Sequence, residues 1–117
     1  MHVLFVALGG ALGAVLRYGV GLLVLHRGQV SFPWATLLVN LTGSFLIGLI
    51  GPSLVRHDAA RLLLAVGVLG GFTTFSTYSL DALTLLHAHR YTALAAYVLV
   101  STLGGLGLCA LGWRLAS

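Results

Sequence analysis

The sequence contains no lysine and no glutamate, and its charged side chains are six arginines and two aspartates. Charged residues make up 7% of the 117 positions, whereas a soluble domain carries about 25%. So few charges cannot cover a folded chain against water, but lipid hydrocarbon accepts an apolar surface. The composition therefore excludes an ordinary soluble domain and indicates a membrane protein.

Other scarcities exclude further classes of protein. The single cysteine, Cys109, cannot form an intrachain disulfide and says nothing about redox compartment. The arginines are spread singly and form no basic stripe, so the net charge of +4 does not indicate nucleic acid binding. The five histidines lie at segment ends or in loops, and no acid–base pair or phosphate-binding loop stands out. We therefore expect no nucleic acid partner and no enzyme activity.

Long apolar runs dominate what remains, with apolar residues at 59% of the positions. A helix needs about 20 apolar residues to cross the hydrocarbon core. Four segments meet that requirement, and short polar or turn-forming connections join them. The sequence predicts one all-α membrane domain over residues 1–117, with a retained first helix and spans at 3–25, 34–55, 62–86 and 91–113.

The arginines give little information on orientation. Four spans place both termini on one side, together with Arg56, Arg61 and Arg114, while Arg27 and Arg90 lie on the other. Three against two is a weak bias under the positive-inside rule. This balance permits an antiparallel homodimer in which one subunit is inverted. A single orientation set by the 56–61 loop remains the alternative.

The second span carries Thr36, Asn40 and Ser44 at four-residue steps, which places them on one helical face. An asparagine in the middle of a span is costly unless it is hydrogen-bonded. Asn40 either makes a structural hydrogen bond between helices or belongs to a polar track with the two aligned hydroxyl residues.

The third span contains the most informative pattern. Gly70 and Gly71 are followed by five serine and threonine residues within the seven positions 73–79. Each glycine costs roughly 1 kcal/mol in a helix relative to alanine, and hydroxyl side chains satisfy backbone groups that a break sets free. The pattern predicts a broken helix at mid-membrane, where such breaks form ion and substrate sites. The alternative is a kinked, inert helix.

The polar side chains that the sequence places near the middle of the membrane are mainly hydrogen-bond donors. Asp81 is the only acidic residue within a span, and it lies too near the exit of the third span to serve a proton-coupled cation pathway. Phe72, Phe75 and Tyr78 recur beside the break and can present positive ring edges. Arg17 either adds positive potential to the route or extends to the interface. These features favour a small, hard, strongly hydrated anion.

Three motifs in this order resemble the Fluc (CrcB) family of fluoride channels. They are GGALGAVLRY at residues 9–18, WATLLVNLTGSF at 34–45 and GGFTTFST at 70–77. The resemblance covers the whole chain in length, spans and motif order. It implies a passive fluoride channel of the cell inner membrane, assembled as an antiparallel, dual-topology homodimer with two pores.

The resemblance also implies roles for individual residues. A structural sodium ion on the dimer axis would be held by the backbone carbonyls of Gly70 and Thr73 from both subunits. Asn40 would donate to fluoride, and Phe75 and Tyr78 would present ring edges, although phenylalanine is usual at the latter position. Asp81 stands where glutamate is common. The remaining positions implied or aligned along the pathway are Arg17, Thr36, Ser44, Ser76, Thr77, Tyr97 and Ser101.

Two other four-helix readings compete with a fluoride channel. A small multidrug-type exporter needs a carboxylate in the first span, and residues 3–25 contain none. A structural subunit of a larger membrane complex does not need the glycine pair and clustered hydroxyls of the third span.

Overall fold

The computed structural model describes residues 1–27 and 31–117, and all regular elements in these ranges are helical. The first span is α1 (His2–His26) and the second is α2 (Trp34–Leu54). Between them, the predicted connection at 26–33 falls partly outside the described residues.

The third and fourth spans are each built from several helical pieces. The third comprises α3 (Asp58–Ala60), the π-helical η1 (Arg61–Leu69), α4 (Gly70–Phe72) and α5 (Phe75–His87). The fourth comprises α6 (Tyr91–Leu99), the π-helical η2 (Val100–Gly104) and α7 (Gly105–Ala116). Within residues 1–27 and 31–117, four helical units are therefore long and apolar enough to cross a membrane, which confirms the predicted all-α, four-span protein.

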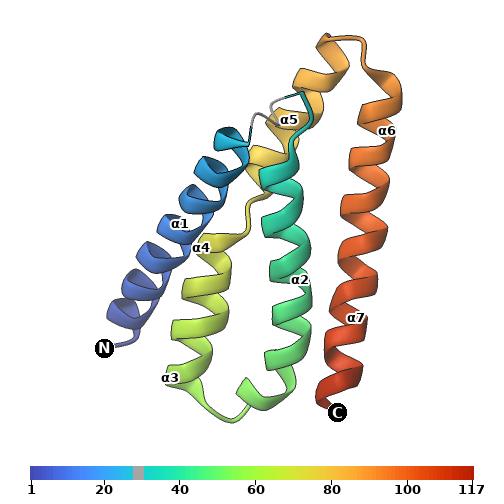
Figure 1. Cartoon of the computed structure of the whole chain (residues 1–117). Coiled ribbons are helices and arrows are strands. Elements are labelled where there is room, and N and C mark those ends of the chain that lie inside the picture. Colours follow the sequence, from blue (N-terminus) through green and yellow to red (C-terminus); the bar gives the residue numbers. More distant parts are fainter. Residues whose placement is uncertain (28–30) are drawn as a thin grey trace.

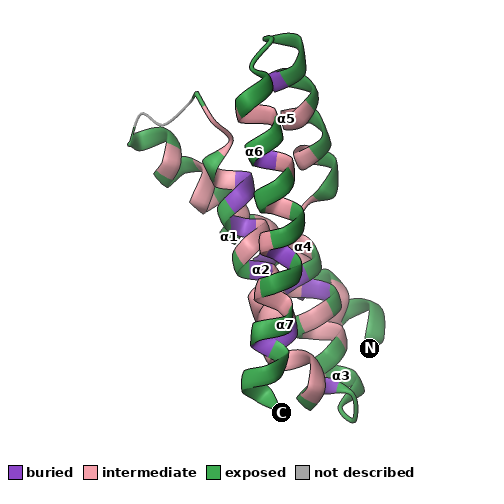
Figure 2. Cartoon of the chain, turned by 90° about the vertical axis from the view of Figure 1, so that its right-hand side faces the viewer, coloured by how far each residue is buried: buried purple, intermediate pink, exposed green. Residues whose placement is uncertain are grey.

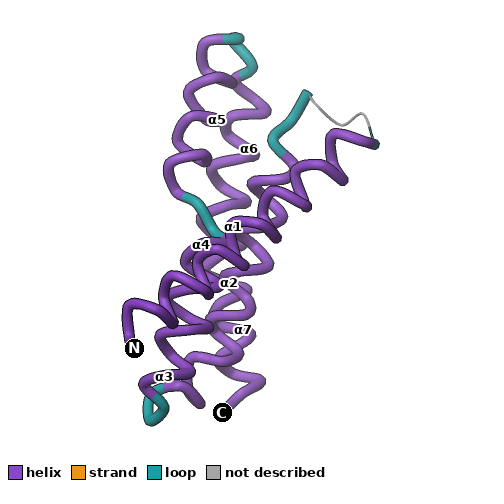
Figure 3. The backbone as a smooth tube through the Cα atoms, turned by 90° about the vertical axis from the view of Figure 1, so that its left-hand side faces the viewer, coloured by secondary structure: helices purple, strands orange, loops and turns teal. Residues whose placement is uncertain are grey.

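Figure 1 shows how these units are arranged. Both termini lie at the end that also holds the turn between α2 and α3, and the α5–α6 turn lies at the opposite end. The main packing pairs are α2 with α7 and α1 with η1 and α4. In Figure 3, α1 crosses the third span beside α4, while α5 continues away from the bundle centre with α6 as its neighbour.

Small residues bring these helices into backbone contact. A methyl group added at Gly13 of α1 would overlap the carbonyl oxygen of Val68, and one added at Gly48 of α2 would overlap the carbonyl oxygen of Cys109. Close approach of this kind drives helix association in lipid, where the hydrophobic effect gives no drive. The glycines therefore fix α1 on the third span and α2 on the fourth.

Few side chains are buried within a single chain. The buried cluster consists of Leu37, Leu85 and Tyr97, and most large apolar side chains are exposed. Figure 2 accordingly shows exposed residues over most of the helical surface. This pattern suits a chain whose outer surface meets lipid hydrocarbon or another copy of itself.

Two extended residues separate α4 from α5. Thr73 has φ −84° and ψ 157°, and Thr74 has φ −153° and ψ 118°. The glycine pair itself is helical within α4, so the interruption lies just after it. Threonine adopts extended conformations readily because its branched side chain fits them. Thr74 then caps α5, since its side chain accepts a hydrogen bond from the amide of Thr77 at 3.2 Å.

Candidate functional site

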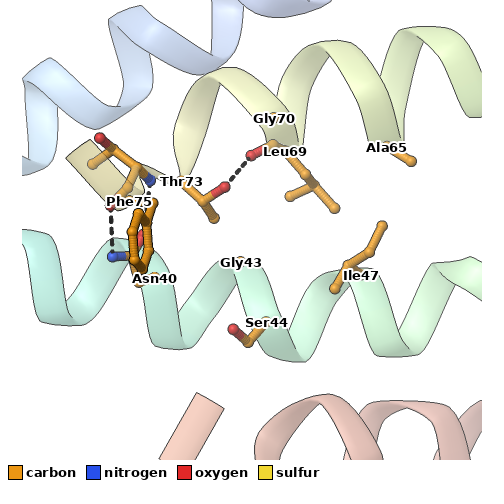
Figure 4. Close-up of a pocket in the computed structure, with 10 residues that line it drawn as sticks. Asn40, Gly43, Ser44, Ile47, Ala65, Leu69, Gly70, Thr73 and Phe75 are labelled. Atoms are coloured by element: carbon orange, nitrogen blue, oxygen red, sulfur yellow. Dashed lines mark hydrogen bonds between the residues drawn. The ribbon is translucent and has the colours of Figure 1, made fainter. Parts of the chain in front are cut away.

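Asn40 of α2 is hydrogen-bonded to the backbone at the interruption. Its Oδ1 accepts from the amide of Thr74 at 2.9 Å, and its Nδ2 donates to the carbonyl of the same residue at 3.1 Å. Figure 4 shows both bonds. The side-chain amide thus satisfies the Thr74 amide, which a continuous helix would have satisfied, and gives the Thr74 carbonyl a second hydrogen bond beside that of the first turn of α5. This pairing engages one of the two amide N–H groups of Asn40.

The interruption also removes the usual helical donors from the carbonyl groups at the end of α4, among them those of Gly70 and Thr73. In a continuous helix the amide of Thr74 would bond to the Gly70 carbonyl, and the amide of Thr77 to the Thr73 carbonyl. Instead, the Thr74 amide donates to Asn40 and the Thr77 amide donates to the Thr74 hydroxyl. The carbonyls of Gly70 and Thr73 therefore lose their ordinary partners at the carboxyl end of the first half of the span.

A hollow of about 340 Å³ lies beside these carbonyls, between α2 and the third span. It is shown in Figure 4, and its lining comprises Asn40, Gly43, Ser44, Ile47, Ala65, Leu69, Gly70, Thr73, Thr74 and Phe75.

The carbonyl oxygens beside this hollow are suitable ligands for a hard monovalent cation. The described part of the chain holds no cluster of three His, Cys, Asp or Glu side chains that could bind a metal ion. Freed carbonyls at the end of a half-helix are the groups that coordinate sodium in broken-helix membrane proteins. The backbone at Gly70 and Thr73 thus has the chemistry that the predicted sodium site requires.

A second hollow, of about 460 Å³, lies on the other side of Thr74, among α1, α2 and α5. Its polar lining residues are Arg17, Tyr18, Thr36, Thr74 and Thr77. Arg17 is half-buried, and its Nε donates to the carbonyl of Gly71 at 3.2 Å. The guanidinium therefore lies against the negative carbonyl end of α4.

Aromatic rings continue from the interruption toward α6. Phe75 is 78% exposed, and its ring centroid lies 5.5 Å from that of Tyr78. The Tyr78 ring is 5.2 Å from the ring of Tyr97, whose side chain is fully buried. The Tyr97 hydroxyl donates to Oδ2 of Asp81 at 3.1 Å. Phe32 packs edge-on against Tyr97 at 5.6 Å.

Several hydroxyl groups of the third span bond within their own segment. Thr73 donates to the carbonyl of Leu69 at 2.9 Å, and Ser79 donates to the carbonyl of Phe75 at 3.0 Å. The Thr74 hydroxyl lies 3.3 Å from that of exposed Ser76. These hydroxyl groups stabilise the interruption and the first turn of α5.

The remaining predicted positions lie on α2, α5 and the fourth span. The Thr74 hydroxyl donates to Oγ1 of Thr77 at 3.2 Å. Ser44 faces Gly105 of α7. Among the described residues, the Oγ of Ser101 is buried without a hydrogen-bond partner.

A single chain thus groups the predicted site residues in three places. Asn40, Ser44, Gly70, Thr73 and Phe75 line the first hollow. Arg17, Thr36 and Thr77 line the second. Tyr78, Asp81 and Tyr97 form the aromatic cluster, while Ser76 is exposed and Ser101 lies one turn beyond Tyr97.

Two residues that sequence reasoning missed also belong to the site. Gly43 lines the first hollow and contacts Thr73, and its signal is its position three residues after Asn40 on the same helix. Phe32 packs on Tyr97, and nothing in the sequence pairs these two positions.

Comparisons with known proteins show the family of this chain. The family described as CrcB-like protein, Camphor Resistance (CrcB) matches residues 4–113. A protein of Thermus thermophilus named fluoride-specific ion channel FluC is 51% identical over 115 residues, covering 96% of this chain and 92% of the relative.

Two further relatives carry the same name. That of Rhizobium meliloti (strain 1021) is 50% identical over 104 residues, covering 86% of this chain and 83% of the relative. That of Helicobacter acinonychis (strain Sheeba) is 46% identical over 118 residues, covering 97% and 93%. With nearly the full length matched by both the family and these relatives, the chain belongs to the CrcB-like family of multi-pass membrane proteins.

Proposed function

We propose that this chain forms a fluoride channel, which lets the anion leave the cell passively and so limits its accumulation. The observation that carries the proposal is the near full-length identity of about one half to relatives named as fluoride-specific ion channels. The same relatives support an ion channel rather than an enzyme. The donor-rich interruption in the third of four apolar spans gives a physical place for conduction.

The third span is, in this proposal, a broken helix whose interruption lies within the bilayer. The extended residues Thr73 and Thr74 fall between helical pieces of one 30-residue apolar unit, Asp58–His87. Non-helical backbone at membrane depth is tolerated where protein or water covers it. Asn40 covers one side of the interruption through its two bonds to Thr74.

The other side of the interruption supports a dimer. Gly70 and Phe75 are exposed on the single chain, and the first hollow lies between them and α2. A carbonyl group facing lipid without a partner costs several kcal/mol, so this surface needs a polar cover. We propose that a second copy supplies it, inverted in the membrane, as the near balance of arginines between the two faces permits.

The freed carbonyls support a sodium site at the centre of this dimer. Gly70 and Thr73 of both copies would hold the ion, since each copy directs a half-helix end toward it. Bound sodium would supply a positive charge that offsets these negative ends. In each chain, the Asn40 pairing and the cap of Thr74 hold the two carbonyls in place.

For fluoride, the chain offers donors and positive potential. Arg17 lies in the second hollow, which we propose as the vestibule, with Thr36 and Thr77 on its wall. The remaining N–H of Asn40 and the ring edges of Phe75 and Tyr78 would receive the ion as it loses water. The other proposed pathway positions are Ser44, Ser76, Asp81, Tyr97 and Ser101.

Efflux from liposomes tests the proposal. Purified protein is reconstituted into vesicles loaded with fluoride and chloride, and ion-selective electrodes follow both anions after dilution. We expect rapid fluoride release with chloride retained, and no fluoride release from protein-free vesicles over the same time. Equal release of both anions, or release of neither, would overturn the proposed function.

A further inference from the structure

We propose that Gly43 is a positioning residue for the sodium site. Because it has no side chain, it leaves room for the methyl group of Thr73 and so determines where the Thr73 carbonyl lies. The inference rests on the sodium site proposed above. It assigns a role in cation binding to a residue of α2 that supplies no ligand itself.

Gly43 is buried on α2, three residues after Asn40, and lines the first hollow with Gly70 and Thr73. A Cβ atom at this position would overlap Cγ2 of Thr73. The next nearest atoms, Thr73 Cβ at 3.7 Å and Phe72 Cδ2 at 3.8 Å, would remain in ordinary contact. Among the described residues, a methyl group here therefore conflicts only with the methyl group of Thr73.

That methyl group cannot simply rotate away. Oγ1 of Thr73 donates to the carbonyl of Leu69 at 2.9 Å, which fixes the side-chain rotamer. A branched side chain has few alternative rotamers, and turning this one would break the hydrogen bond. Figure 4 shows the bond to Leu69, with Thr73 above Gly43.

The backbone cannot simply move away either. The residue after Thr73 is held on both its amide and its carbonyl by Asn40. Thr73 is therefore held on one side by its hydrogen bond to Leu69 and on the other by the bonds between Asn40 and the next residue. Gly43 leaves the space that the Thr73 side chain occupies in this position. An added methyl group at Gly43 has to displace Thr73, and with it one of the two carbonyl groups assigned to sodium.

The test compares sodium affinity in matched variants. The variants are Gly43→Ala, the double variant Gly43→Ala/Thr73→Ser, and the single variant Thr73→Ser. Serine keeps the hydroxyl donor and lacks the methyl group that conflicts. Gly19→Ala is the control, because nothing lies within 4 Å of a Cβ atom at that position. Thermal unfolding in detergent is followed while sodium replaces N-methylglucamine at constant ionic strength.

We expect wild type and Gly19→Ala to unfold at higher temperature as sodium rises, with similar half-saturating concentrations. Gly43→Ala should need at least about tenfold more sodium than wild type, equivalent to about 1.4 kcal/mol. Thr73→Ser is the reference for the double variant, which should need within about threefold of the sodium that Thr73→Ser needs. If Gly43→Ala alone does not fold, recovery of both folding and sodium response in the double variant gives the same support.

Two contradictory results have different meanings. A sodium response in wild type that is unchanged in Gly43→Ala, or that the double variant fails to restore, refutes the positioning role and leaves the sodium site standing. Absence of any sodium response in wild type refutes the sodium site and this inference together. Fluoride efflux of wild type, measured separately, then shows whether the channel proposal survives.

Discussion

Replacing Asn40 by aspartate tests the central contact of the site. The carboxylate can still accept from the Thr74 amide, as Oδ1 does at 2.9 Å, but it cannot donate to the Thr74 carbonyl, as Nδ2 does at 3.1 Å. Losing that hydrogen bond costs about 0.5–1.5 kcal/mol, because the Thr74 carbonyl, at the N-cap of α5, keeps its helical partner. The new charge also repels fluoride: two unit charges about 4 Å apart interact by about 4 kcal/mol at an effective dielectric constant near 20.

An energy of about 4 kcal/mol corresponds to roughly a thousandfold change. We therefore expect fluoride efflux of the Asn40→Asp variant to fall below about 1% of wild type in the liposome assay. Asn40→Leu is the matched uncharged variant, and it removes both bonds to Thr74. It should unfold at lower temperature than wild type, because the Thr74 amide loses its partner and the Thr74 carbonyl loses one of its two. Wild-type efflux in the aspartate variant would refute the placement of Asn40 on the fluoride route.

Three further substitutions give distinct outcomes. Gly48→Ala should lower the free energy of unfolding by about 1–3 kcal/mol, because its methyl group would overlap the α7 backbone, whereas Gly107→Ala, with open space around it, should unfold like wild type. Phe75→Ala should lose most fluoride efflux while the chain stays folded, since this ring is 78% exposed on one chain; retained efflux would remove the ring from the route. Tyr97→Phe should cost about 1.5–3 kcal/mol of stability, because it removes a hydrogen bond to the Asp81 carboxylate, and unchanged thermal unfolding would show that this bond contributes nothing.

The four spans could be predicted because hydrophobic length dominates helix formation in lipid. The first predicted span, 3–25, corresponds to α1 (His2–His26), and the second, 34–55, to α2 (Trp34–Leu54). Apolar composition sets these lengths directly. The start of the third unit at Asp58 precedes the predicted residue 62, because a short polar turn of helix adds no apolar signal.

The interruption shows what local sequence can and cannot specify. A glycine pair followed by hydroxyl residues disfavours a continuous helix at that point. In the structure, however, Gly70 and Gly71 are helical, and the extended residues are Thr73 and Thr74. Tertiary contact decides the position, because Asn40 bonds to the backbone of Thr74 from another helix. Such a contact spans 34 residues and leaves no local signal.

The polar face of α2 was similarly predictable only in part. Thr36, Asn40 and Ser44 share a face by helical spacing, but the structure distributes them between two hollows separated by Thr74. Asn40 makes structural hydrogen bonds to another helix, which is one of the two roles that the sequence left open for it. Its proposed contact with fluoride depends on the amide N–H that this pairing leaves, which helical spacing alone could not reveal.

A reversal potential in a planar bilayer tests the claim of passive, fluoride-selective conduction most directly. Purified protein is incorporated into a bilayer with fluoride at different concentrations on the two sides and chloride held equal. We expect a current that reverses at the equilibrium potential of fluoride and shifts with every change in the fluoride ratio. Current that reverses at the chloride potential, or no current while fluoride still leaves vesicles by exchange, would contradict the claim.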